Sequence, residues 1–175
     1  MTVDDVRSSP RDHGRVELLT RRPEVDAREV LEEATLDPAR GLVGDNWETK
    51  PSLATGWPNP LAQLTLMNSR AAALVAGERE RWPLAGDQFY VDLDLSYANV
   101  PPGTRLSLGS AVIEITEEPH LGCGKFAKRF GVDALKLVNS SVGRELNMRG
   151  VNARVITGGT VRSGDEIAKL GSAPA

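Results

Sequence analysis

Cysteine is nearly absent from this chain, since Cys123 is the only one among 175 residues. A single thiol excludes an internal disulfide framework and any four-cysteine zinc or iron–sulfur site. The two histidines, His13 and His120, are far apart in sequence, so with one cysteine they do not suggest a closed zinc site. A lone thiol persists in a reducing compartment, and we therefore expect a cytoplasmic protein.

Long apolar runs are also missing. None approaches the roughly 20 residues that a membrane-spanning helix needs, and the charged N-terminus has no apolar signal segment. The chain lacks a nucleophile elbow, a P-loop and a Rossmann glycine fingerprint. Its net charge of −3 gives no reason to expect nucleic-acid binding. These absences argue against the common hydrolase and nucleotide-binding classes and against membrane or nucleic-acid partners.

What the chain does contain is a series of short β patterns. Residues 15–20, 61–67 and 88–95 are strand candidates, and apolar residues alternate along the last of them. Gly109-Ser110 stands between two more such runs and predicts a hairpin. Another β region spans residues 151–170. The pattern predicts one mainly β domain over residues 14–170, a barrel or closed sheet with a few helices. Residues 1–13 are expected to be a disordered lead-in and residues 171–175 a tail.

Helices are expected in two places. Asn68 and Ser69 follow a strand candidate directly and can N-cap a helix over residues 70–76, which leaves backbone N–H groups available to an anion. Apolar residues recur at helical spacing over residues 125–146, with a break at Gly131. Residues 25–34 fit either a helix or an extended arm. Residues 51–60, which are rich in proline and glycine, are expected to form a loop.

Cys123 lies at the head of a cationic segment. Residues 123–154 hold seven basic side chains and two acidic ones, although the whole chain is acidic. Gly122 and Gly124 flank the cysteine and allow a ligand to come close to it, while Lys125 would favour its thiolate. Such a segment can concentrate a small anionic ligand. The alternatives are a buried cysteine that packs as a small hydrophobe and a helix with a solvated basic face. His120 would either donate to the sulfur or serve as a turn residue.

Several sequence runs together resemble one family, the MOSC domain, named for its place at the C-terminus of molybdenum cofactor sulfurases. The longest run extends from Leu146 to Asp165 and reads LNMRGVNARVITGGTVRSGD. Shorter matches are GLVGD at residues 41–45, LMNSR at 66–70, Gly86-Asp87, and PGTRLSLG at 102–109. They follow the order of the family over about residues 14–170.

The resemblance implies a closed β-barrel of the pyruvate-kinase-barrel kind. It also implies a cysteine that ligates molybdenum or carries sulfur, and Cys123 occupies the matching place. Pyridoxal phosphate enters the description of this family through relatives fused to a desulfurase-like domain. This chain has no room for that domain and no convincing aldimine lysine, so pyridoxal phosphate is not expected.

The chain departs from the family pattern at two positions and in its domain content. Gly122 precedes the cysteine where many members have proline, and Gln88 stands where many small members have asparagine. We do not expect these 175 residues to form the N-terminal β-barrel partner of amidoxime-reducing relatives or an electron-delivering ferredoxin or flavin domain. Binding therefore carries over from the family more safely than turnover.

Three functions follow as hypotheses, and none of them sets the oligomeric state. The first is a molybdenum-cofactor enzyme that reduces N-hydroxylated compounds with an external reductase. In this hypothesis Cys123 is the catalytic residue and the metal ligand. The residues expected to hold the molybdenum–pterin cofactor are Asn68, Ser69, Gln88, Lys125, Arg149 and Asn152. The second is a sulfur carrier that takes sulfur onto Cys123 from a cysteine desulfurase, and the third is a non-catalytic module for a small anionic cofactor.

Overall fold

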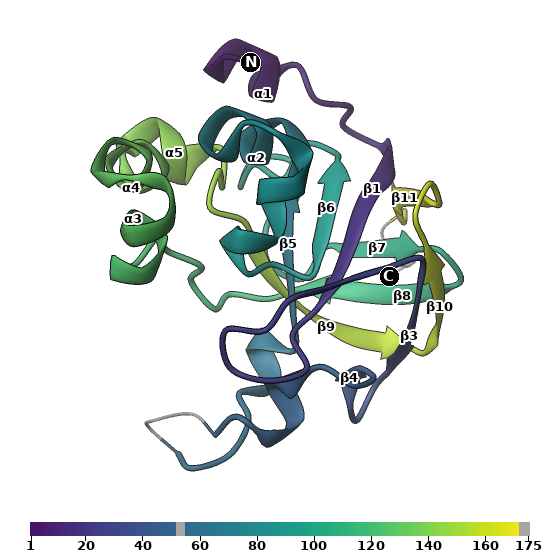
Figure 1. Ribbon diagram of the computed structural model, residues 1–175. Helices are drawn as coiled ribbons and strands as arrows, with labels where there is room; N and C mark the ends of the chain where they lie inside the picture. The colour runs from purple at the N-terminus through teal and green to yellow at the C-terminus, as the bar shows by residue number, and fades with distance from the viewer. Residues whose placement is uncertain (52–54, 172–175) are drawn as a thin grey trace.

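A computed structural model describes residues 1–51 and 55–171 of the chain. Within these residues, seven strands close into a barrel through hydrogen bonds between the first and last strands (Figure 1). The neighbours are antiparallel except for one parallel pair, β5 and β6. The barrel strands, in chain order, are β1 (His13–Arg21), β5 (Leu64–Asn68), β6 (Phe89–Asp92), β7 (Arg105–Leu108), β8 (Ala111–Ile115), β9 (Val151–Thr157) and β11 (Glu166–Lys169). The predicted closed, mainly β fold is confirmed.

The remaining strands lie outside the barrel. Residues 25–34, which fitted either a helix or an extended arm, lead into two short strands instead of a helix. One of these strands pairs with β1 and the other belongs to a separate three-stranded sheet. These additional strands are β2 (Glu29–Leu31), β3 (Glu33–Asp37), β4 (Gly41–Leu42) and β10 (Gly159–Arg162). The loop expected over residues 51–60 lies partly outside the described residues.

The α-helices are gathered on one side of the barrel (Figure 1). The α-helices are α1 (Val3–Arg7), α2 (Ser69–Ala76), α3 (Gly124–Phe130), α4 (Val132–Asn139) and α5 (Ser141–Glu145), and the 3-10 helices are η1 (Asn46–Thr49), η2 (Pro60–Ala62) and η3 (Arg79–Ala85). The predicted helix over residues 70–76 is confirmed, and the side chain of Asn68 caps it. The predicted break at Gly131 separates α3 from α4. A second break, at Ser140, was not expected; there the serine Oγ accepts the N–H of Gly143 and starts α5.

The N-terminal segment differs from the expected disorder. Residues Val3–Arg7 form α1, which Thr2 caps, and the strand β1 already begins at His13. Val6 is buried in the cluster of apolar side chains beneath α2, and Ser9 accepts a hydrogen bond from Asn68. The sequence pattern of one apolar residue among charges is too short to show this packing, which depends on contacts with a distant helix.

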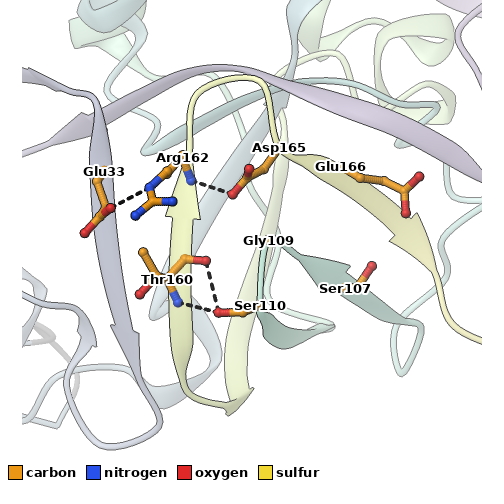
Figure 2. Close-up of a pocket in the computed structure, with 8 residues that line it drawn as sticks. All are labelled: Glu33, Ser107, Gly109, Ser110, Thr160, Arg162, Asp165 and Glu166. Carbon is orange, nitrogen blue, oxygen red and sulfur yellow. Dashed lines mark hydrogen bonds and ion pairs between the residues drawn. The ribbon is translucent and has the colours of Figure 1, made fainter.

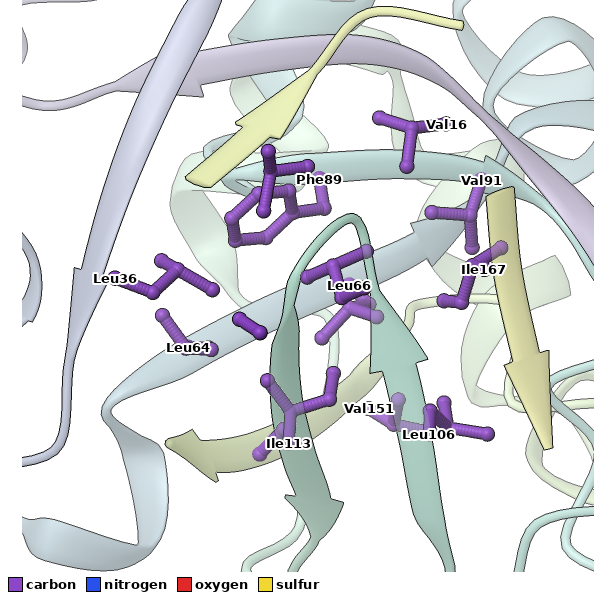
Figure 3. Packing of buried hydrophobic residues seen from close by; sticks show 14 of the residues in the cluster. Val16, Leu36, Leu64, Leu66, Phe89, Val91, Leu106, Ile113, Val151 and Ile167 are labelled. Carbon is purple, nitrogen blue, oxygen red and sulfur yellow. The ribbon is translucent and has the colours of Figure 1, made fainter. Parts of the chain in front are cut away.

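Alternation along the strands divides the apolar side chains between two clusters. Leu66 and Phe89 point into the barrel, where they pack with Val16, Ile113 and Ile167 (Figure 3). The next residue on each strand, Met67 and Tyr90, points outward and packs under the helices. This follows from the period of two in a strand, which sends successive side chains to opposite faces. The outer cluster fixes the helices against the barrel and thereby positions the loop that carries Cys123.

The predicted hairpin at Gly109-Ser110 is confirmed, with Leu108 paired to Ala111. Gly109 adopts a φ of 56°, and a Cβ on it would lie 2.4 Å from the carbonyl oxygen of Thr160. Glycine is therefore required both for the turn and for the close approach of β10.

Candidate functional site

Cys123 is exposed at the end of the loop that leads from β8 to α3, where it is the residue before the helix. The loop is held by Asn139 of α4, whose Oδ1 accepts the N–H of Gly122 at 3.0 Å and whose Nδ2 donates to its carbonyl at 3.1 Å. Proline at position 122 has no N–H to donate. A Cβ there would also lie 2.8 Å from Leu135. The departure from the family's proline thus has a local cause.

The pKa of the Cys123 thiol lies below its ordinary value. Backbone hydrogen bonding from Phe126 has the largest effect and favours the thiolate; burial opposes it, and backbone hydrogen bonding from Lys125 and the charges of Arg149 and Arg129 add to the lowering. An accessible thiol with a lowered pKa is the form that bonds soft metals and attacks sulfur. The alternative of an inert buried cysteine does not describe this exposed residue.

A buried carboxylate, Asp87, joins two of the residues around this loop. Its Oδ1 lies 2.7 Å from His120 Nε2 and its Oδ2 lies 2.6 Å from Arg149 Nη1, and Asp87 itself is fully buried. Burial acts to raise the pKa of Asp87, but the charge of Arg149 and the contact with His120 outweigh it, so the pKa is lowered. Burial, together with Arg149, lowers the pKa of His120. At neutral pH, Asp87 is therefore ionised and the neutral imidazole donates Nε2–H to it.

The absence of a side chain at Gly150 leaves room for the close packing of Asp87 and His120. It has a φ of 117°, and a Cβ on it would lie 2.4 Å from the carbonyl oxygen of Leu66 and 3.0 Å from the His120 ring. Asp87 Oδ1 would be only 3.3 Å away. No larger residue fits here without moving the strand β5 or the buried carboxylate, so the Arg149-Gly150 pair in the family signature has a structural reason.

Four arginines converge on the end of η3 and on Gly86, the residue that follows it. Each donates to a different one of four consecutive carbonyl oxygens: Arg28 Nε to Pro83 at 3.2 Å, Arg129 Nη1 to Leu84 at 2.8 Å, Arg149 Nη2 to Ala85 at 2.9 Å and Arg22 Nη1 to Gly86 at 3.2 Å. These side chains come from the end of β1, the segment before β2, α3, and the segment between α5 and β9. We call this group the arginine cluster.

The arginine cluster carries more positive than negative charge. Asp45 pairs with Arg22, Asp87 with Arg149, and Asp26 with both Arg129 and Lys125. Arg28 has no ion-pair partner in the described part of the chain, and burial, followed by repulsion from Arg129 and Arg22, lowers its pKa. Five cations thus meet three carboxylates beside the Cys123 loop, an arrangement that attracts an anion.

Two of the expected cofactor-binding residues, Asn68 and Ser69, are buried at the start of α2. Asn68 is buried and its side chain is fully used, because Oδ1 caps α2 while Nδ2 donates to Ser9 and to the Leu93 carbonyl. Ser69 begins α2 and is buried. These two residues support the fold, and the structure gives no indication that they bind a ligand.

The other three expected residues adjoin parts of the candidate site: Gln88 follows Asp87, Lys125 follows Cys123 closely, and Asn152 contacts the Cys123 loop. Gln88 is completely buried; its Oε1 accepts the N–H of Thr65 at 2.8 Å, and its Nε2 has no partner in the described residues. Lys125 is exposed and next but one to Cys123 in sequence. Asn152 Nδ2 donates to the carbonyls of Glu118 and Pro119, so it holds the start of the Cys123 loop.

The residues that the predicted binding set left out are Asp87, His120, Arg22 and Arg28. Asp87 stood in a Gly-Asp match to the family, but one carboxylate gives no sign of its partners. His120 was considered mainly as a turn residue, and its partner lies 33 positions earlier. Arg22 and Arg28 lie outside the cationic segment 123–154, and only the barrel brings them to it.

A polar cavity of about 460 Å³ lies at the hairpin of β7 and β8, away from Cys123 (Figure 2). Its charged and polar groups pair with each other: Arg162 Nε contacts Glu33 Oε2 at 2.6 Å, and Ser110 Oγ exchanges hydrogen bonds with the backbone of Thr160. Asp165 accepts the backbone N–H of Arg162. We call it the hairpin groove, and its internal pairing makes it a weaker candidate than the Cys123 region.

The described residues do not by themselves supply a complete set of metal ligands. No group of three or more histidine, cysteine or acidic side chains in residues 1–51 and 55–171 is arranged to cage a metal ion. A metal bound at Cys123 would therefore take its other ligands from a cofactor or from water.

None of the helices in residues 1–51 and 55–171 has the length and apolar character needed to cross a membrane.

Comparison with known proteins identifies the family. The MOSC domain profile matches residues 60–168, more than half of the chain, and the chain therefore belongs to the MOSC domain family. A search of curated protein sequences returned no match.

Solved structures share the fold. YuaD from Bacillus subtilis is 20% identical, with a TM-score of 0.61, over 89% of this chain and 94% of that one. YiiM from Escherichia coli is 20% identical, with a TM-score of 0.58, over 92% and 72%. YiiM from Geobacillus stearothermophilus is 13% identical, with a TM-score of 0.62, over 90% and 75%. At these identities the likeness extends to the fold alone.

Proposed function

We propose that this MOSC domain binds a molybdenum–pterin cofactor, with the Cys123 thiolate on molybdenum and the anionic groups of the cofactor near the arginine cluster. The observation that carries the proposal is an exposed thiol with a lowered pKa beside five cations and three carboxylates. A thiolate suits a soft metal, and guanidinium groups suit phosphate.

The residues present fit such a group. Arg149 Nε and Gln88 Nε2 are buried donors without partners in the described residues. Unpaired buried donors are uncommon in native proteins because each costs free energy, and a ligand rich in acceptors would relieve that cost after a small side-chain movement. The single thiol also suits a metal whose remaining ligands belong to the cofactor, since the described residues form no cage of their own.

Each residue has a definite task in this proposal. Arg149 and Arg129 attract the anion and add to the lowering of the Cys123 pKa. Asp87 holds the Arg149 guanidinium and the His120 ring in place. Asn139 fixes the loop so that the sulfur stays at its end. Bound molybdenum would supply two-electron redox chemistry, and an external reductase would deliver the electrons for reducing N-hydroxylated compounds.

Metal analysis tests the proposal directly. Protein made in a host that synthesises the cofactor should contain molybdenum and releasable pterin, and Cys123→Ser should lose most of the metal. Arg149→Gln should retain less pterin than wild type, whereas Arg162→Gln in the hairpin groove should match wild type. Wild-type protein without molybdenum under these conditions would contradict the proposal.

The exposed, easily ionised thiol equally favours sulfur transfer, which is the second candidate. Cys123 would attack the outer sulfur of a desulfurase persulfide, forming a new S–S bond and releasing the donor's cysteine thiolate. Mass spectrometry after incubation with a cysteine desulfurase and cysteine should then show one added sulfur in wild type and none in Cys123→Ser. Unchanged wild-type mass would exclude this role.

A further inference from the structure

The three carboxylates of the arginine cluster are not equivalent. The side chains of Asp45 and Asp87 are completely buried, and each must stay in place because a buried guanidinium left unpaired is costly. The side chain of Asp26 is instead 63% exposed; its Oδ1 lies 3.2 Å from Arg129 Nη2 and 3.6 Å from Lys125 Nζ. Exposed ion pairs contribute little to stability. Asp26 is therefore the carboxylate of the cluster that can leave its partners most easily.

Asp26 lies in the loop of residues 22–28, which connects β1 with β2. Both ends of this loop are fixed, because Arg22 and Arg28 each donate to a backbone carbonyl at the end of η3 or directly after it. Residues 23–27, between the two arginines, are mostly exposed. In the parts of the chain that the structure describes, the Asp26 carboxylate forms all of their ion pairs and side-chain hydrogen bonds. The middle of the loop is thus attached to α3 through this one carboxylate.

The backbone of Asp26 also favours release of this contact. Its φ is 62°, in the left-handed region that is costly for a residue with a side chain. Aspartate and asparagine tolerate this conformation better than most residues do. The loop therefore turns the carboxylate toward α3 at a conformational cost, and that cost is relieved when the loop moves outward.

Two guanidinium groups face one place beside this contact. A Cβ on Gly86 would lie 3.2 Å from Arg28 Nη2 and 3.9 Å from Arg129 Nη1, so both side chains converge above the same residue. Burial, followed by repulsion from Arg129 and Arg22, lowers the pKa of Arg28, and the charge of Asp26 offsets this only in part. The single exposed carboxylate thus leaves positive charge that a larger anion would neutralise better.

We propose that the Asp26 carboxylate is a displaceable internal anion. It occupies the position beside Arg129 and Lys125 that a tetrahedral oxyanion takes on binding, and the middle of the 22–28 loop then moves outward. Such an oxyanion offers three oxygens where a carboxylate offers two, so it can engage Arg28 in addition to Arg129 and Lys125. This inference rests on the anion-binding role of the arginine cluster in the proposed function, but it requires neither molybdenum nor Cys123.

Nuclear magnetic resonance titrations of the full chain, made in a host that lacks the cofactor, test the displacement with methyl phosphate and methyl sulfate. The probes share a tetrahedral shape, but at pH 7.5 methyl phosphate carries nearly two negative charges, since its second pKa is about 6, and methyl sulfate carries one. Asp26→Asn removes the charge and keeps a side chain that tolerates positive φ. It should tighten both probes by the same factor, about three- to fivefold, because each displaces the same exposed carboxylate.

Glu24→Gln is the matched control, because Glu24 is an exposed carboxylate of the same loop without an ion pair in the described residues. It should change either affinity by less than about twofold, as for a screened charge. Binding of either probe should also shift the backbone amide signal of Asp26 in the wild type.

A carboxylate that stays in place would act only through its field, and Asp26→Asn would then favour the dianion by roughly the square of the factor for the monoanion. That result would overturn the proposal, as would wild-type affinity in Asp26→Asn or no binding of either probe. Unchanged affinity in Asp26→Asn would leave anion binding by the arginine cluster intact. Absence of molybdenum from the protein would not alter these titrations, so the two proposals fail separately.

Discussion

The hairpin groove and the arginine cluster are both rich in charge, yet they differ in how that charge is balanced. In the groove, Arg162 and Glu33 form an exposed one-to-one pair, with 67% and 49% of their side chains accessible. In the cluster, cations outnumber carboxylates, and the side chains of Asp45 and Asp87 are completely buried. Exposed pairs contribute little to stability, whereas buried charges must be matched or they cost several kcal/mol. The difference makes the arginine cluster the better candidate of the two regions for binding an anion.

Removing the central carboxylate should have the largest effect. Asp87→Ala leaves the buried Arg149 guanidinium without its partner and should lower the free energy of unfolding by about 3–5 kcal/mol. Urea denaturation measures this. Glu33→Ala, which breaks the exposed pair of the hairpin groove, should cost at most about 1 kcal/mol. Equal losses in the two variants would remove the distinction between the two regions.

Two glycines with positive φ sharpen the same comparison. Gly150→Ala should destabilise the protein by about 1–3 kcal/mol beyond any effect of its backbone conformation, because its Cβ meets the Leu66 carbonyl and the His120 ring. In Gly164→Ala, at the turn beside the groove, the nearest atom is the end of the flexible Arg15 side chain at 3.4 Å. Thermal unfolding of both variants isolates the steric contribution. A greater loss in Gly164→Ala would contradict this account.

The pH dependence of stability should come partly from His120. Because its folded-state pKa is lowered, the unfolded chain takes up a proton that the folded chain resists. Stability is therefore full above the unfolded pKa of about 6.5 and falls as the pH decreases below it. Asp87, whose pKa is also lowered, adds a loss below about pH 4.

Urea denaturation at pH 7.5 and 5 should show that His120→Gln loses less stability on acidification than wild type does. His13→Gln, at an exposed histidine that contacts Glu166, should behave as wild type. If His120→Gln lost as much stability as wild type, His120 would not be the source of the pH dependence.

The smallest expected effect concerns the reactivity of Cys123. Arg129→Gln removes one of the charges that lower its pKa, so alkylation by iodoacetamide at pH 7 should slow by about two- to threefold, as for one partly screened charge. Arg162→Gln should have no effect. An unchanged rate in Arg129→Gln would show that the charge of Arg129 does not contribute to the reactivity of the thiol.

Much of the barrel is predictable because its signals are local. Alternation around Phe89 and Val91, and the glycine turn at Gly109-Ser110, depend only on the two-residue period of strands and on turn geometry. The N-cap at Asn68 is equally local. The folding of residues 1–13 was not predictable, because burial of Val6 depends on α2, more than sixty residues away.

The residues of the candidate site likewise fall into those that local sequence predicts and those that only the fold brings together. Cys123, Lys125 and Arg149 follow from one cationic segment and a family signature, and Cys123 is the centre of both proposed functions, cofactor binding and sulfur transfer. The sequence by itself determined the family, the barrel and the single thiol, since these rest on residue type, order and short-range periodicity. Only the tertiary structure decided which charges meet. Asp87, His120, Arg22 and Arg28 reach the site from separate segments because closing the barrel brings the start of β6, the end of β1 and the Cys123 loop to one place.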